Sequence, residues 1–353
     1  MSGATPVLKP LNEQVIVITG ASSGIGLTTA REAVKAGARV VVSSRNEEAI
    51  AQLERELSMG DAGQRRALAV VCDVTSEDQV RKLARTAVET FGGFDTWVNN
   101  AGVSIYGWIE EIEREDMRQL FETNFWGVVH GSLAALEHLK GRGGAIINIG
   151  STLSDRAIPL QGIYSASKFA VRGFTDAFRM EVEKAGYPVS VTLIKPAAID
   201  TPYVQHAKNY LPAEPNNPPP VYAPEVVASA ILHCASNPER DMFAGGAGAM
   251  FSFMEKAMPR RTDHAMEATL FRQQQKDEPA EPRGDAGLYR PAGPVLEERG
   301  KYEGKVFHSS PYTAAKMNRG LVALGAGVGV GVLAATLLSH RRDDEHERDD
   351  RLH

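Results

Sequence analysis

Short apolar runs alternate with longer amphipathic stretches through the first half of the chain. The runs are rich in β-branched residues and are not broken by regular polar positions, which is typical of strands covered on both faces of a sheet. They predict strands at residues 14–19, 39–44, 67–72, 96–99, 145–150 and 189–194.

The amphipathic stretches between these runs carry apolar residues at helical spacing. They predict helices at residues 24–36, 47–58, 77–91, 113–139 and 164–185. Because strands and helices alternate, the pattern indicates an α/β fold of the Rossmann type, with a doubly wound parallel sheet in a single domain. Such a sheet binds its ligand at the carboxyl ends of the strands.

The pattern loosens after residue 194. Residues 211–224 hold six prolines in fourteen positions, too many for a helix or a central strand, so we expect a loop or a mobile lid there. A helix at 225–235 restores order. Residues 273–317 are polar and rich in Pro, Gly and Arg, a composition typical of a linker with little structure of its own.

Residues 320–339 are twenty positions without a charge. As a helix this run would be about 30 Å long, the thickness of the hydrocarbon core of a bilayer. Flanking arginines and glycines at GxxxG spacing favour a membrane span, and the alternative is an apolar helix that packs on the domain or on another chain. We therefore divide the chain into a domain at 1–265, a linker at 266–319, a membrane-spanning or packing helix at 320–339 and a charged tail at 340–353.

Composition narrows the classes of function. With 43% hydrophobic and 24% charged residues and a net charge of -5, the chain lacks the basic surface that nucleic acid requires. Cys72 and Cys234 belong to no cluster with metal-ligand spacing, so we expect no metal site. The N-terminus lacks the apolar segment of a secretory signal, which leads us to expect a cytoplasmic domain that the 320–339 helix can hold at a membrane.

A glycine-rich turn follows the first predicted strand and opens the first predicted helix. Glycines let the backbone turn tightly and approach a pyrophosphate, whose charge is met by free N–H groups at the helix N-terminus. The candidate cofactor-binding residues of the turn are Gly20, Ser22, Ser23, Gly24, Ile25 and Gly26. Taken alone, the turn is also compatible with a purely structural connection.

The next strands end in further candidates. Ser44 and Arg45 stand where an NAD site places a carboxylate, so the sequence favours NADP(H), whose 2′-phosphate a guanidinium can bind; a solvated arginine is the alternative. Asp73, which can accept a hydrogen bond from an adenine amino group, and Val74 follow the third strand. The small residues of Asn100-Ala101-Gly102 follow the fourth. Each is also compatible with an ordinary turn.

Tyr164 and Lys168 lie four residues apart at the start of a predicted helix, which puts both side chains on one face. A free phenol is a poor base near neutrality, and a neighbouring ammonium favours the phenolate. The hydroxyl of Ser151 can bond a substrate oxygen, and Asn124 can hold a water for a proton relay. Each residue alone is compatible with a structural role.

Together these motifs resemble those of the short-chain dehydrogenase/reductase family. They follow one another in the same order as in that family, and the resemblance covers residues 12–250. The resemblance implies a seven-stranded parallel sheet, usually a homodimer or homotetramer, and a catalytic tetrad of Asn124, Ser151, Tyr164 and Lys168.

The resemblance also implies contacts with the cofactor from Tyr164 and Lys168, with Lys168 at the nicotinamide ribose. It places Pro196 and Thr201 beside the nicotinamide. Ala197 stands where the family commonly has glycine, a departure that affects the shape of this loop.

We therefore expect an oxidoreductase that moves a hydride between NADP(H) and a ketone, aldehyde or secondary alcohol, with Tyr164 as the acid/base. Residues 152–163 and 198–222, with Ile105, Tyr106 and Trp108, would recognise the substrate, and their apolar content indicates a hydrophobic small molecule. The alternatives are a non-catalytic NADP(H)-binding sensor or scaffold and an NAD-dependent alcohol dehydrogenase.

Overall fold

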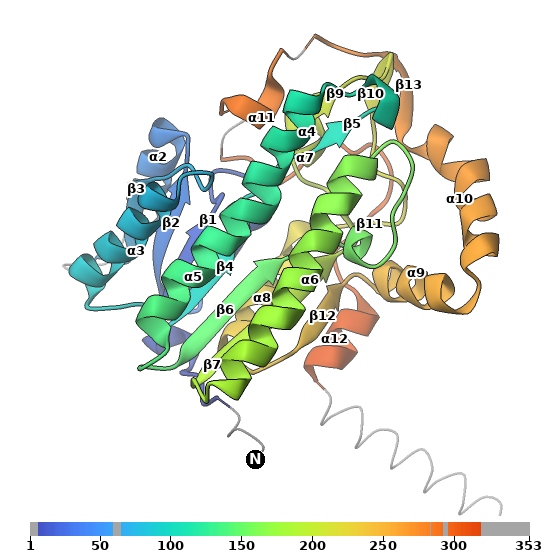
Figure 1. The fold of residues 1–353 in the computed structure, drawn as a ribbon. Helices are drawn as coiled ribbons and strands as arrows, with labels where there is room; N and C mark the ends of the chain where they lie inside the picture. Colours follow the sequence, from blue (N-terminus) through green and yellow to red (C-terminus); the bar gives the residue numbers. More distant parts are fainter. Residues whose placement is uncertain (1–5, 59–64, 283, 292–295, 319–353) are drawn as a thin grey trace, which may run out of the picture.

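A parallel sheet of seven strands forms the centre of the computed structural model, which describes residues 6–58, 65–282, 284–291 and 296–318 (Figure 1). The order of the strands reverses beside β1: on one side of β1 the sheet extends through β2 and β3, and on the other side it extends through β4 and the later strands. Across the sheet the strands are β12 (Asp241–Ala244), β7 (Val189–Pro196), β6 (Gly144–Ile149), β4 (Thr96–Asn99), β1 (Val15–Thr19), β2 (Arg39–Ser44) and β3 (Ala67–Val71).

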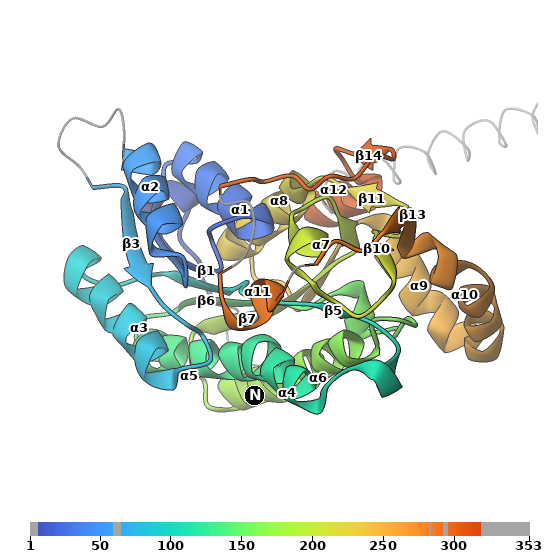
Figure 2. The same ribbon diagram turned by 90° about the horizontal axis from the view of Figure 1, so that it is seen from above.

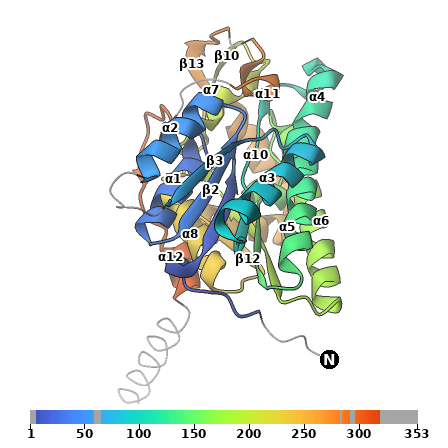
Figure 3. The same cartoon turned by 90° about the vertical axis from the view of Figure 1, so that its left-hand side faces the viewer.

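Helices cover both faces of the sheet, as Figures 2 and 3 show. One face carries α1 (Gly24–Lys35), α2 (Glu47–Ser58) and α8 (Pro224–Ser236). The other face carries α3 (Glu77–Phe91), α4 (Arg114–Phe121), α5 (Gly127–Leu139) and α6 (Gly162–Lys184). The sheet is therefore the middle layer of three.

Every residue of β1 is buried, and alternate side chains enter different cores. Ile16 and Ile18 pack in the cluster that contains Leu27 of α1. Val15 and Val17 pack in the cluster that contains Leu83 of α3. Burial on both faces explains why the strands are unbroken apolar runs instead of alternating patterns.

The predicted strands and helices of the sheet domain are confirmed to within two residues at each end. The predicted helix 113–139 consists of α4 and α5 joined by a π-helical turn, Glu122–Trp126. The pattern did not identify β12, which only the family resemblance implied. β12 is an edge strand whose side chains alternate between partly and fully buried.

After β7 the chain builds a layer over the carboxyl edge of the sheet. Residues 211–223 form no helix and contribute two short strands, and Pro224 begins α8. The helices of this layer are α7 (Tyr203–His206), α9 (Gly246–Ala257) and α10 (Pro259–Gln273). Its short strands are β8 (Ala198–Ile199), β9 (Lys208–Asn209), β10 (Ala213–Pro215) and β11 (Val221–Tyr222). β5 (Ile105–Tyr106), which precedes β7 in the chain, joins this layer by pairing with β9.

Residues 266–319 differ from the linker with little structure that the composition predicts, because most of the described part folds back onto the domain. After α10, its elements are β13 (Gln275–Pro279), α11 (Ala286–Tyr289), β14 (Val306–Phe307) and α12 (Pro311–Met317). β13 pairs with β10, β14 pairs with β11, and the side chain of Leu288 is fully buried. Backbone hydrogen bonds between strands and the buried side chain of Leu288 hold this segment on the domain. The polar composition of the segment does not indicate either kind of contact.

The structure contains no helix, among the residues it describes, that is long and apolar enough to cross a bilayer. The uncharged run 320–339 and the tail 340–353 lie outside those residues.

Two helical glycines should respond oppositely to replacement by alanine. A Cβ at Gly131 of α5 would lie 1.9 Å from Asn99 Oδ1, whereas nothing lies within 4 Å of a Cβ at Gly173 of α6. Gly131→Ala should lower the free energy of unfolding by about 1–3 kcal/mol because the core is overpacked. Gly173→Ala should raise it by up to about 1 kcal/mol through helix propensity. Urea denaturation of both variants checks this, and equal effects would contradict the packing described for α5.

Candidate active site

A cavity of about 590 Å³ opens at the carboxyl edge of the sheet, where the strand order reverses. Loops that follow β1, β2, β3, β4, β6 and β7 all contribute to its wall. The predicted site residues that line it are Gly20, Ser22, Ser23, Gly24, Ile25, Ser44, Arg45, Asp73, Val74, Asn100, Ala101, Gly102, Ser151, Tyr164, Lys168, Pro196 and Thr201. Gly26 and Asn124 lie behind the wall.

The glycine-rich turn is held by close backbone packing. Gly20 has a φ of 67°, and a Cβ there would lie 2.7 Å from the Cα of Ala101. A Cβ on Gly26 would lie 2.3 Å from the carbonyl oxygen of Gly20. The Asn100 amide donates to the carbonyls of Thr19 and Gly20 at 2.9 and 3.0 Å. Gly26 therefore acts by packing, and the turn brings the N-terminal residues of α1, Gly24 and Ile25, to the wall of the cavity.

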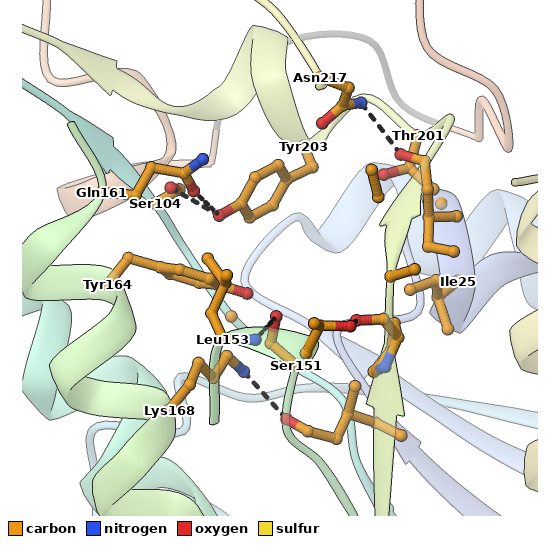
Figure 4. A pocket seen from close by; sticks show the side chains of 18 of the residues that line it. Ile25, Ser104, Ser151, Leu153, Gln161, Tyr164, Lys168, Thr201, Tyr203 and Asn217 are labelled. Atoms are coloured by element: carbon orange, nitrogen blue, oxygen red, sulfur yellow. Dashed lines mark hydrogen bonds between the residues drawn. The ribbon is translucent and has the colours of Figure 1, made fainter. Parts of the chain in front are cut away.

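Tyr164, Lys168 and Ser151 meet on one side of the cavity (Figure 4). α6 begins at Gly162, so Tyr164 and Lys168 lie one turn apart in its first two turns. Lys168 Nζ donates to the carbonyl of Ile149 at 2.9 Å and lies 5.6 Å from the centre of the Tyr164 ring. Ser151 Oγ accepts from the Leu153 N–H at 3.0 Å, which fixes the hydroxyl beside the phenol.

Burial moves the pKa values of the phenol and the amine in opposite directions, because it favours the neutral form of each group. Burial raises the pKa of Tyr164 to about 12, against the opposing effect of hydrogen bonds to Tyr203 and Ser151. Burial lowers the pKa of Lys168 to about 8. Burial therefore favours a protonated phenol at Tyr164 and makes the neighbouring ammonium of Lys168 a stronger acid than an exposed one.

Asn124 lies in the π-helical turn between α4 and α5 and is fully buried. Its side-chain oxygen accepts from the Val103 N–H at 2.8 Å. Its amide nitrogen donates to the Val103 carbonyl at 2.9 Å and to Ser167 Oγ at 3.2 Å. The side chain thus ties the loop after β4 to the helix that carries Tyr164. Such π-helical turns occur frequently at functional sites.

Arg45 and Asp73 stand at the far end of the cavity from Tyr164. The Arg45 guanidinium donates to the backbone carbonyls of Gly287 and Leu288 in α11. Burial lowers the pKa of Arg45, and the charge of Asp73 opposes this shift. The Asp73 carboxylate accepts from the N–H and the hydroxyl of Thr75 at 3.0 and 2.9 Å. Both side chains are therefore held in place by hydrogen bonds within the protein.

Tyr203 lies in the segment 198–222 that is predicted to recognise the substrate, although the sequence does not single it out. Its hydroxyl lies 2.7 Å from Ser104 Oγ and 3.2 Å from Gln161 Oε1, and its ring meets the Tyr164 ring edge-on at 5.5 Å (Figure 4). Burial raises the pKa of Tyr203 well above its ordinary value. Gln161 in turn bonds Gln274. Tyr203 belongs to a four-residue helix in a loop, and no local motif marks it.

The remaining wall of the cavity is apolar and comes largely from α9 and α10. Its apolar residues include Leu153, Ile158, Phe251, Met254, Met266 and Leu270. Arg156 fastens both helices, since its guanidinium pairs with Glu255 of α9 and with Asp263 of α10. The sequence feature that could have indicated the second of these helices is Pro259, because proline is common at the first position of a helix.

Of the three residues predicted to recognise the substrate, Tyr106 lines the cavity. Ile105 and Trp108 do not. Ile105 is buried in the cluster beneath Tyr164, and Trp108 is half exposed and stacks on Phe271 at 5.0 Å. Of these three residues, only Tyr106 is therefore placed to contact a molecule in this cavity.

Comparison with known proteins agrees with this geometry. Residues 14–210 match the family model described as short chain dehydrogenase. The chain is 46% identical over 331 residues to the uncharacterized oxidoreductase YxnA of Bacillus subtilis, covering 93% of this chain and 92% of that protein.

Two solved structures share the fold. An alcohol dehydrogenase from Thermococcus sibiricus, complexed with 5-hydroxy-NADP, aligns with a TM-score of 0.57 and 27% identity over 65% of this chain and 94% of that one. A short-chain dehydrogenase/reductase from Burkholderia phymatum, in complex with NAD, aligns with a TM-score of 0.63 and 23% identity over 78% of this chain and 100% of that one. The protein belongs to the short-chain dehydrogenase family and is an oxidoreductase.

Proposed function

We propose that the protein is an NADP(H)-dependent oxidoreductase that interconverts an apolar ketone or aldehyde and the corresponding alcohol, with Tyr164 as the acid/base. The observation that carries this proposal is the meeting of the Tyr164 phenol and the Ser151 hydroxyl at one wall of the cavity, with Lys168 one helical turn away. Nucleotide binding alone would not call for this group of side chains.

The rest of the cavity fits a dinucleotide. The first amides of α1 can bind a pyrophosphate, since the first N–H groups of a helix have no partner within it. Solved relatives bound to 5-hydroxy-NADP and to NAD support a nicotinamide cofactor. Ser44 and Arg45 at the end of β2 favour the phosphorylated form, because β2 ends without a carboxylate that would repel a 2′-phosphate.

Each polar side chain then has a task in carbonyl reduction. Bound nicotinamide supplies the hydride to the carbonyl carbon. The Ser151 hydroxyl donates to the carbonyl oxygen, and the Tyr164 phenol gives its proton to the same oxygen as the alcohol forms. The Lys168 ammonium stabilises the phenolate that is left, and its lowered pKa suits it to return a proton to Tyr164. Oxidation of an alcohol reverses these transfers.

An apolar substrate is supported by the wall that α9 and α10 provide. Phe251, Met254 and Met266 face the cavity. The one arginine in this wall, Arg156, is paired with two carboxylates. A hydrophobic body with a single carbonyl matches these surroundings better than a charged or strongly polar molecule.

We also propose a homo-oligomer, supported by large apolar side chains exposed on α6, on α5 and in the turn before α5. Trp126, Leu133, Phe169 and Met180 are each at least two-fifths exposed. A group of exposed apolar residues on neighbouring helices is typical of an interface between copies of a chain.

Replacing Tyr164 with Phe should lower kcat by about 10²- to 10⁴-fold, the usual contribution of a general acid. The affinity for NADPH should stay nearly unchanged, because only the hydroxyl is lost. The measurement is consumption of NADPH across a panel of apolar ketones and aldehydes, with small sugars as the polar comparison.

Tyr187→Phe is the matched control for this experiment. It removes a hydroxyl from an exposed tyrosine that does not line the cavity, and should therefore leave turnover nearly unchanged. Undiminished turnover in Tyr164→Phe would refute the catalytic role. Activity on small sugars alone would refute the apolar substrate.

Replacing Lys168 with Met should change how stability depends on pH. Because burial lowers the pKa of Lys168 from 10.5 to about 8, the unfolded chain binds more protons than the folded one between these values. The penalty for burying the ammonium is therefore full below pH 8 and disappears as the pH rises towards 10.5. The unfolding free energy of Lys168→Met minus that of the wild type should fall by up to about 3 kcal/mol over this window.

Urea denaturation at several pH values measures this difference. Lys184→Met, at an exposed position on the same helix, is the control and should show a constant difference. A constant difference for Lys168→Met as well would show that its amine is not perturbed.

Replacing Arg45 with Ala should weaken NADPH binding by about 10- to 100-fold, the effect of losing charged hydrogen bonds. Binding of NADH, which lacks the 2′-phosphate, should change far less. Fluorescence titration of both cofactors measures the ratio, with exposed Arg55→Ala of α2 as control. Equal losses for NADPH and NADH would contradict a 2′-phosphate contact and favour an NAD-dependent enzyme.

A further inference from the structure

Between β13 and β14 the C-terminal segment contributes α11, which packs against α4 and α7 at the carboxyl edge of the sheet (Figure 2). Its described parts near the cavity are residues 284–291, which contain α11, and residues 296–300. We call these two parts the strap. Gly287 and Pro291 of the strap line the same cavity as the glycine-rich turn.

The strap pairs with the glycine-rich turn through the backbone. The Leu296 N–H donates to the Ser22 carbonyl at 2.8 Å, and the Gly24 N–H donates to the Glu297 carbonyl at 2.9 Å. These two hydrogen bonds bracket Ser23. The strap therefore lies directly on the turn that would hold the pyrophosphate.

Its other end engages the residue that would bind the 2′-phosphate. The Gly287 and Leu288 carbonyls accept from the Arg45 guanidinium, and the Leu288 side chain is fully buried in the cluster that contains Tyr164. The strap thus contacts both the pyrophosphate region and the 2′-phosphate region of the proposed cofactor site.

Side chains fasten the strap outside the cavity. Glu298 pairs with Arg31 of α1 at 2.7 Å, and Arg299 pairs with Glu225 of α8 at 2.6 Å. The Gly300 N–H donates to Asp200 Oδ1 at 3.1 Å. A Cβ on Gly300 would lie 2.5 Å from the Thr201 carbonyl oxygen, so only glycine permits this approach.

The cavity persists with the strap in place. Its wall includes Ser22 to Ile25, Arg45 and Asp73 together with Gly287 of the strap. The strap uses the Gly24 amide, and the amides of Ile25 and Gly26 have no partner within the helix by helix geometry. A docked strap and a bound dinucleotide are therefore compatible.

We propose that the strap is the second half of the cofactor site: it closes over the bound dinucleotide, which leaves only after the strap lifts. This rests on the proposed function, because it takes the cavity as a dinucleotide site. The strap lies outside residues 14–210, which the family model matches. Its effect is slow exchange of cofactor, while the apolar wall of α9 and α10 belongs to the substrate side.

The test is the rate at which NADPH dissociates from the full-length protein, measured by stopped-flow displacement with excess NADP⁺. Gly300→Ala forces the strap away from Thr201 and should raise the dissociation rate about tenfold or more, as expected from losing backbone hydrogen bonds. Glu298→Ala removes one fastening that does not touch the cavity and should raise the rate by about two- to threefold. Gly141→Ala, where nothing lies within 4 Å of the added Cβ, is the matched control and should leave the rate unchanged.

Hydrogen exchange of the Leu296 and Gly300 amides gives a second readout in the wild type. Their exchange should slow when NADPH binds. Equal dissociation rates in all four proteins would refute the proposed role of the strap and leave the proposed function intact. Exchange rates of the strap amides that do not change when NADPH binds would do the same. A wild type that binds neither NADPH nor NADH would refute the proposed function and the strap together.

Discussion

Burial of both faces of the parallel sheet is the constraint on which the rest of the structure depends. β1 lies between two apolar cores, and none of its five residues reaches solvent to any large extent. Polar chemistry can gather only where strands end and the backbone emerges. The turn after β1, Ser151 after β6 and the loop after β7 therefore meet at one edge, and the reversal of strand order beside β1 leaves room between them.

The same burial sets the chemistry of Tyr164 and Lys168. A low-dielectric site favours neutral groups, so the phenol keeps its proton and the amine gives its proton up more easily. A phenol that stays protonated is a ready donor to a carbonyl oxygen. The cost is a buried ammonium below pH 8, which the hydrogen bond to the Ile149 carbonyl offsets in part.

Features with a local signal could be predicted from the sequence. Residues close together in the sequence define the glycine-rich turn, the strands and the Tyr164–Lys168 pair. The structure brings the turn and the pair to one cavity. Gln161 and Gln274, which bond each other, are 113 residues apart, and neither belongs to a motif. The sequence identifies Arg45 by its side chain, but it cannot identify the partners of Arg45. These are the backbone carbonyls of Gly287 and Leu288, and a backbone carbonyl is present in every residue. The composition of residues 266–319 therefore predicts a linker with little structure, whereas in the structure backbone contacts hold part of this segment at the wall of the cavity.

The pairing of Ser22 and Gly24 with Leu296 and Glu297 joins positions near the two ends of the described chain. During synthesis the sheet domain can fold before these last residues emerge from the ribosome, since domains fold as units from the N-terminal side. The wall of the cavity is then completed late, after the sheet and its helices have formed. A chain that is cut short before residue 296 would keep its central fold and lack the backbone partners of the glycine-rich turn.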